Sequence, residues 1–85
     1  MEPTQSTVKI RDLGLAAALL TRDVELSNTV TAEKGRIYFI FCYDDDLAAD
    51  IDTAIDNYWY HHLEVDARRY FDNIKLLKSL IYRER

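Results

Sequence analysis

RIYFIFCY, residues 36–43, is the stretch that decides the fold, because it combines aromatic and β-branched residues in a pattern typical of a strand. Its apolar residues fall on both faces of an extended chain: Ile37, Phe39, Phe41 and Tyr43 on one face, and Tyr38, Ile40 and Cys42 on the other. We therefore predict a central strand that is either covered on both sides or forms the seam of an oligomer.

The residues before this stretch predict its hairpin partner. Val24, Leu26 and Val30 keep a period of two, which indicates a half-buried strand. The polar residues 31–35 then form a loop, with Gly35 at a left-handed position.

Further towards the N-terminus, the run Leu13–Leu20 is apolar on all sides and predicts a buried helix with Asp12 as its N-cap. Val8 and Ile10 alternate with basic residues, which suits either a short extra strand or an extended lead-in to that helix. Residues 1–7 are polar and are expected to form a flexible N-terminal arm.

Two amphipathic helices are predicted after the central strand. The first begins at the N-capping run Asp44-Asp45-Asp46 and ends near Tyr58. The second is capped by Asp66, ends near Tyr82, and carries Leu76 and Leu80 as a second ridge beside its inner face. The inner face of this last helix is expected to hold Ala67, Tyr70, Phe71, Ile74, Leu77 and Ile81.

The predicted fold class is therefore α+β, with a small antiparallel hairpin or sheet packed with three helices in the order α-β-β-α-α. A chain of 85 residues holds one core, so residues 8–85 form a single domain. Because such a small domain has little stability to spare, we expect it to self-associate, with a dimer as the simplest form.

Several classes of protein are disfavoured by composition. The lone Cys42 cannot support a disulfide framework and is expected to be a packed small hydrophobe, which indicates a reducing compartment, the cytoplasm. No signal peptide is visible, and the longest apolar stretch is too short for a membrane span. With two glycines and no catalytic motif, the chain is expected to be neither an enzyme nor a cofactor-binding protein.

Charge is strongly segregated along the chain. Residues 44–66 carry eight acidic residues and no basic ones, whereas residues 67–85 have a net charge of +4. One interpretation is that the acidic and basic helices are neighbours that partly neutralise each other at their rims. The other is that each helix binds an external partner, the acidic one a basic protein and the basic one phosphate.

Candidate metal ligands have stronger structural explanations. The aspartates at 44–46 and Asp50 lack the spacing of a calcium loop and are expected to act as caps, so no metal site is predicted. His61 and His62 are expected to be surface or loop residues, although Glu64 lies near enough in sequence for a general base to be considered.

Several segments together resemble a small uncharacterised domain of bacterial and phage proteins, catalogued as a domain of unknown function. The segments are residues 12–16, Leu19-Leu20, residues 35–41, Tyr58-Trp59, residues 63–66 and residues 77–82. The resemblance implies a phage, mobile-element or bacterial accessory protein and supplies no mechanism. It also places a small polar residue or glycine after Tyr58-Trp59, where this chain has Tyr60-His61-His62.

We therefore expect a small non-enzymatic interaction protein without cofactors, which docks on a nucleic-acid-handling protein and inhibits it or assists it. The acidic partner-binding face is Asp45, Asp52 and Asp56, and the apolar interface is Tyr58, Trp59, Tyr60, Leu76 and Leu80. The alternative is a nucleic-acid-binding module that uses Arg68, Lys75 and Arg83 of the last helix.

Overall fold

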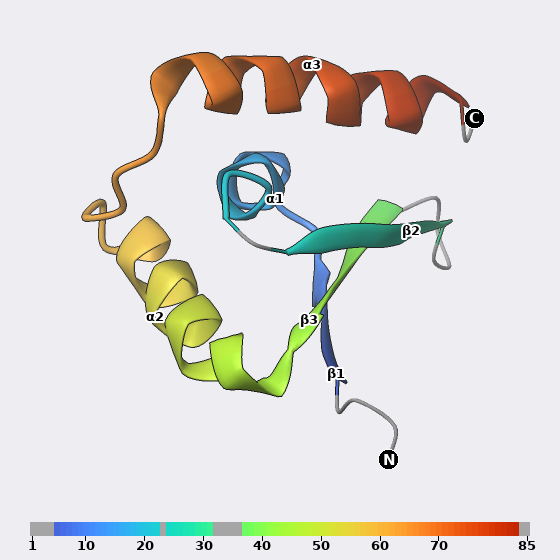
Figure 1. The fold of residues 1–85 in the computed structure, drawn as a ribbon. Coiled ribbons are helices and arrows are strands. Elements are labelled where there is room, and N and C mark those ends of the chain that lie inside the picture. The colour runs from blue at the N-terminus through green and yellow to red at the C-terminus, as the bar shows by residue number, and fades with distance from the viewer. Residues whose placement is uncertain (1–4, 23, 32–36, 84–85) are drawn as a thin grey trace.

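A computed structural model of the chain describes residues 5–22, 24–31 and 37–83 (Figure 1). The elements are β1 (Gln5–Ile10), α1 (Leu13–Leu19), β2 (Glu25–Thr31), β3 (Ile37–Asp44), a 3₁₀ turn η2 (Asp45–Leu47), α2 (Ala48–Trp59) and α3 (Ala67–Arg83). This order confirms the predicted α+β class, and Val8 and Ile10 belong to an extra N-terminal strand. β1 begins at Gln5, inside the segment expected to be an arm, and the predicted loop at residues 31–35 lies almost entirely outside the described residues.

The three strands form an antiparallel sheet in the order β1-β3-β2, so the aromatic strand is central, as predicted. Phe41 pairs with Val8 on one side and with Leu26 on the other. The register with β2 shifts between Leu26 and Asn28, where the strand is irregular.

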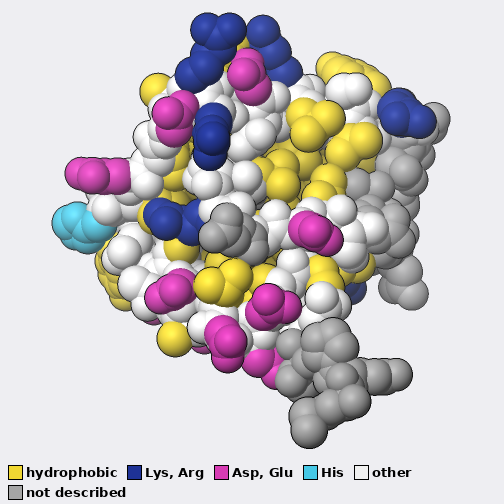
Figure 2. Space-filling model, in the orientation of Figure 1, with side chains coloured by type: hydrophobic (Ala, Val, Ile, Leu, Met, Phe, Trp, Pro, Cys, Tyr) yellow, Lys and Arg dark blue, Asp and Glu magenta, His cyan; other side chains and the backbone are white. Residues whose placement is uncertain are grey.

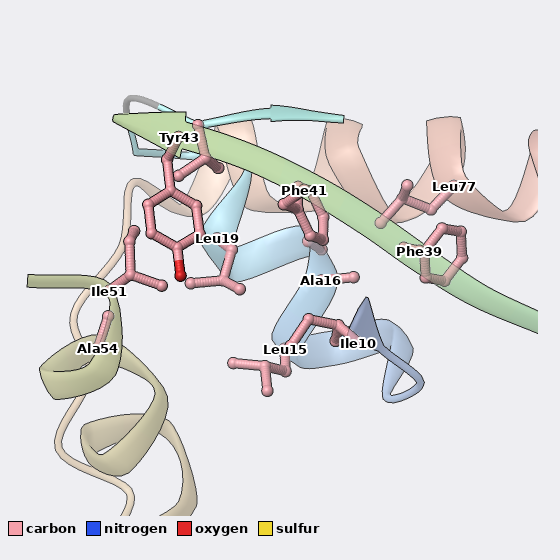
Figure 3. Close-up of a cluster of buried hydrophobic side chains, with 12 residues drawn as sticks. Ile10, Leu15, Ala16, Leu19, Phe39, Phe41, Tyr43, Ile51, Ala54 and Leu77 are labelled. Atoms are coloured by element: carbon pink, nitrogen blue, oxygen red, sulfur yellow. The ribbon is translucent and has the colours of Figure 1, made fainter. Parts of the chain in front are cut away.

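Helix α1 is apolar on all sides because it lies between the sheet and α3 (Figure 1). Asp12 caps it as predicted, since its Oδ1 accepts a hydrogen bond from the Leu15 backbone N–H at 2.8 Å. Figure 3 shows side chains from α1, β3, α2 and α3 meeting in one core. The largest fully buried side chains are Phe39, Phe41, Leu19, Ile51 and Leu77.

We expected β3 either to be covered on both faces or to form the seam of an oligomer. In the structure its second face is not covered by the core. Tyr38, Ile40 and Cys42 are only half-buried and lie outside the core. The Lys9 ammonium sits 5.0 Å from the centre of the Tyr38 ring, and Cys42 Sγ lies 3.2 Å from Gln5 Oε1. Cys42 is therefore a residue of an open sheet face and not of the packed core.

The two predicted caps in the acidic segment differ in outcome. Asp44 holds the N-cap position of the 3₁₀ turn and Asp45 and Asp46 lie in its first turn, as predicted, but the expected side-chain hydrogen bond is absent at the start of both the 3₁₀ turn and α2. Asp45 instead accepts a hydrogen bond from Ser6 Oγ of β1. Asp66 caps α3 as predicted, with its Oδ1 2.9 Å from the Arg69 backbone nitrogen.

The inner face of α3 is narrower than predicted. Leu77 is fully buried, and Tyr70 and Ile81 are half-buried beside it, but Phe71 is 56% exposed. The reason is that α3 rests mainly on the slim helix α1, which covers only the stripe around Leu77. Asn73 lies on that stripe and donates a hydrogen bond from Nδ2 to the Ala17 carbonyl oxygen at 3.1 Å.

Candidate functional site: the exposed faces of the two amphipathic helices

The predicted acidic residues and Trp59 share one outer side of α2. Asp52, Asp56 and Trp59 are spaced by four and three residues, which places them on one side of a helix. Asp45 lies seven residues before Asp52, in η2, and all four residues are exposed. We call Asp45, Asp52, Asp56 and Trp59 the α2 stripe.

The charges of the α2 stripe act on a common region. Burial raises the pKa of Tyr43, and the carboxylates of Asp52 and Asp45 raise it further. Both carboxylates therefore act on the same phenol, although they come from α2 and from η2. The structure thus brings these two predicted acidic residues into one electrostatic field.

The three aromatic residues that were predicted as one cluster separate into two roles. Tyr58 is half-buried and donates a hydrogen bond to Asp12 Oδ1 at 2.8 Å, which ties α2 to the capped start of α1. Burial, this hydrogen bond and the Asp12 charge raise the pKa of Tyr58 to about 12. Trp59 and Tyr60 are 55% and 71% exposed, so they remain available for contact.

A groove of about 670 Å³ separates α2 from β1, an edge strand of the sheet. Ile55 and Trp59 form its α2 side, so the groove runs directly beside the α2 stripe. The sequence did not reveal this groove, because β1 and α2 meet only in the folded chain. Its lining residues are Val8, Lys9, Ile10, Arg11, Asp12, Leu15, Ile55 and Trp59.

The two leucines of the predicted ridge on α3, Leu76 and Leu80, differ in exposure. Leu76 is half exposed, whereas Leu80 is half-buried and packs against the core. Neither residue joins Trp59 in one patch, because α2 and α3 each pack on α1 more than on one another (Figure 1).

The basic side chains of α3 lie in the open, and exposed aromatic residues alternate with them. Arg68, Lys75 and Arg83 are all exposed, and the Lys75 ammonium is 4.5 Å from the centre of the Phe71 ring. Sequence reasoning missed Phe71 and Tyr82 as surface residues, although their distance around the helix from Leu77 is a usable signal. We call the set Arg68, Phe71, Lys75, Lys78 and Tyr82 the α3 stripe.

No ion pair joins the acidic helix α2 to the basic helix α3 in the residues that the structure describes. Within the described ranges the one salt bridge joins Arg68 and Asp72, at 3.6 Å, and both residues belong to α3. Figure 2 shows acidic side chains gathered over α2 and most of the basic ones along α3. The interpretation of mutual neutralisation therefore has no support from ion pairs in this part of the chain.

The histidine pair belongs to a helix terminus. His61 adopts a left-handed backbone with φ 63°, and the His62 N–H bonds to the Asn57 carbonyl at 2.8 Å, as in a Schellman motif. This is where the family resemblance places a glycine or small polar residue. Among residues 5–22, 24–31 and 37–83, no three His, Cys, Asp or Glu side chains form a group that could hold a metal ion.

The fold and these surfaces define a class: a small α+β domain in which one buried helix joins a three-stranded antiparallel sheet to two exposed amphipathic helices. Residues 5–83 match the profile of the family described as a domain of unknown function, DUF5659, and the chain belongs to this family. No curated protein and no solved structure matches it significantly. In the described part of the chain, no helix has the length and apolar character needed to cross a bilayer.

Proposed function

We propose that this chain is a small, non-enzymatic interaction protein of the cytoplasm that binds a basic surface of another protein through the α2 stripe. The observation that carries the proposal is the line of three exposed carboxylates that ends in the exposed Trp59. A Trp beside a row of charges is typical of an interface anchor, because it buries a large area for little loss of side-chain entropy.

The two parts of the stripe have different physical tasks. The carboxylates at positions 45, 52 and 56 steer a basic partner and select its orientation. Trp59 and Tyr60 supply most of the apolar area that slows dissociation. Nucleic-acid-handling proteins carry extensive basic surfaces, so they are the class of partner that this arrangement fits, in keeping with an accessory or inhibitory role in a phage, a mobile element or a bacterium.

The proposal is tested by affinity capture with the immobilised chain, followed by measurement of the captured protein's binding over a range of salt concentrations. Replacing Asp45, Asp52 and Asp56 with Asn should weaken the complex and flatten its dependence on salt. The matched control replaces Asp44, Asp46 and Asp50 with Asn, which removes the same charge away from the stripe. Equal weakening in both triple variants would contradict the proposal.

A second candidate function, nucleic-acid binding through α3, is favoured by the aromatic residues that alternate with its basic residues. Exposed Phe71 and Tyr82 could stack on bases while Arg68, Lys75 and Arg83 contact phosphates. Replacing these three basic residues with Gln should lower the affinity for a fluorescent single-stranded oligonucleotide. It should also reduce the salt slope by about 0.7 for each phosphate that is no longer neutralised. Unchanged affinity would exclude this function.

A further inference from the structure

We infer that the partner of the α2 stripe is a second copy of this chain, bound through the α3 stripe. The inference rests on the proposed function, because it names the partner of the same α2 surface. It follows from three features of the two stripes: their chemistry, their dimensions and their separation within one chain.

The chemistry of the stripes is complementary. The α2 stripe joins three carboxylates to one exposed Trp, and the α3 stripe joins three basic side chains to the exposed rings of Phe71 and Tyr82. The spacing of the α3 residues, alternately three and four positions, keeps them on one side of that helix. Opposite charges on two amphipathic surfaces give a contact that is attractive both electrostatically and through apolar burial.

The dimensions of the stripes also match. One runs over residues 45–59 and the other over residues 68–82, which is the same number of positions. With a rise of about 1.5 Å per residue in an α-helix and about 2.0 Å in the 3₁₀ turn at Asp45–Leu47, each stripe follows about 21–23 Å of helix. In a parallel alignment with an offset of 23 positions, Asp45 falls opposite Arg68, Asp52 opposite Lys75, and Trp59 opposite Tyr82.

Within one chain the two stripes cannot meet. α2 and α3 lie on different sides of α1, and each packs mainly on that helix (Figure 1). Residues 60–66 connect them through a turn and a segment without regular secondary structure. Both stripes therefore face solvent in the isolated chain, and Trp59, Phe71 and Tyr82 remain more than half exposed.

A two-fold dimer satisfies both stripes of both copies. The contact of α2 with the partner's α3 is then made twice, and no stripe is left open to continue into a fibre. A stable interface buries about 800 Å² per partner, which is about an eighth of this chain's 6200 Å² surface. Two separated helical stripes in each copy can share that area.

The test is light scattering after size-exclusion chromatography, over a concentration series at low and high salt. The intact chain should form dimers that weaken as salt rises. Two variants reverse one stripe each: Asp45→Lys, Asp52→Lys, Asp56→Lys in α2, and Arg68→Glu, Lys75→Glu, Lys78→Glu in α3. Each alone should dimerise at least about tenfold more weakly, because both of its stripes then carry the same sign.

An equimolar mixture of the two variants is the decisive measurement, because the reversed stripes complement each other in both contacts and the dimer should return. The control variant reverses Asp44, Asp46 and Asp50, which lie off the stripe. This control keeps both stripes and should dimerise like the intact chain. Mixed with a fluorescently labelled α3 variant at the same net charges, it offers the labelled chain only one complementary contact, so the labelled chain should associate about tenfold more weakly than in the reversed pair. Far-UV circular dichroism and melting curves verify that each variant is folded.

Three results would overturn the inference: an intact chain that stays monomeric into the millimolar range, reversed variants that dimerise like the intact chain, or a mixture that does not associate. A monomer whose captured partner no longer binds the Asp→Asn triple variant would refute the second copy while leaving the proposed function intact. A monomer that binds an oligonucleotide through Arg68 and Lys75 would assign α3 to nucleic acid and likewise refute the inference.

Discussion

Replacing Gly14 with Ala tests how α1, α2 and α3 meet. Gly14 is the second residue of α1, where Ala would ordinarily stabilise the helix by up to about 1 kcal/mol. Here an added Cβ would overlap Tyr58 Oη and lie 3.1 Å from Tyr70 Oη. Tyr58 cannot move aside freely, because its hydroxyl donates to Asp12 at 2.8 Å and its ring packs edge-on against Trp59.

The expected magnitude follows from these contacts. Moving Tyr58 breaks a hydrogen bond to a carboxylate in a half-buried site, which costs about 1–2 kcal/mol, and overpacking adds about 1 kcal/mol or more. After subtracting the helix gain, Gly14→Ala should destabilise the protein by about 1–2 kcal/mol. For a domain of this size the melting temperature should fall by roughly 4–16 °C.

A double-mutant cycle isolates the cause. In a Tyr58→Phe background the overlapping oxygen is absent, so Gly14→Ala should be neutral or stabilising, with a coupling free energy of about 2 kcal/mol. A Tyr70→Phe background is the matched control and should leave Gly14→Ala destabilising, because the overlap with Tyr58 remains. Urea unfolding followed by circular dichroism measures each value. A coupling below about 0.5 kcal/mol, or a stabilising Gly14→Ala in the intact chain, would refute the reasoning.

Three further predictions concern other parts of the fold. His61→Gly should raise the free energy of unfolding by about 1 kcal/mol, because glycine adopts the left-handed backbone without steric cost, whereas His62→Gly should give no gain in the same urea titration. The raised pKa of Tyr58 favours the neutral phenol in the folded state. The free energy of unfolding should therefore be constant just below pH 10 and fall as the pH rises from 10 towards 12. Melting curves over this pH range should show a smaller fall for the Tyr58→Phe variant. Leu77→Ala should lower the free energy of unfolding by about 2–5 kcal/mol, because it leaves a cavity between α3 and the core. Leu76→Ala should lower it by under about 0.5 kcal/mol. Similar values for both variants would mean that α3 is rotated from the orientation described.

The candidate site was only partly predictable from the sequence. The acidic side of α2 follows from helical spacing alone, since Asp52 and Asp56 lie opposite Ile51 and Ala54 in any helix of this register. The inward turn of Tyr58 could not be predicted, because its partner Asp12 is 46 residues away and no local pattern encodes that hydrogen bond.

What the sequence by itself determined is the set of elements and the choice of central strand. Period-two and helical hydrophobic patterns are local properties, and the apolar character of α1 on all sides already required cover on more than one side. Only the tertiary structure decided which apolar faces stay open, because cover depends on the shape of the neighbouring element. The slim α1 buries Leu77 but leaves Phe71 exposed, and Tyr38 remains half-buried on the open side of the sheet. These uncovered residues, together with two charged helices that the fold holds apart, create the surfaces on which a partner can act.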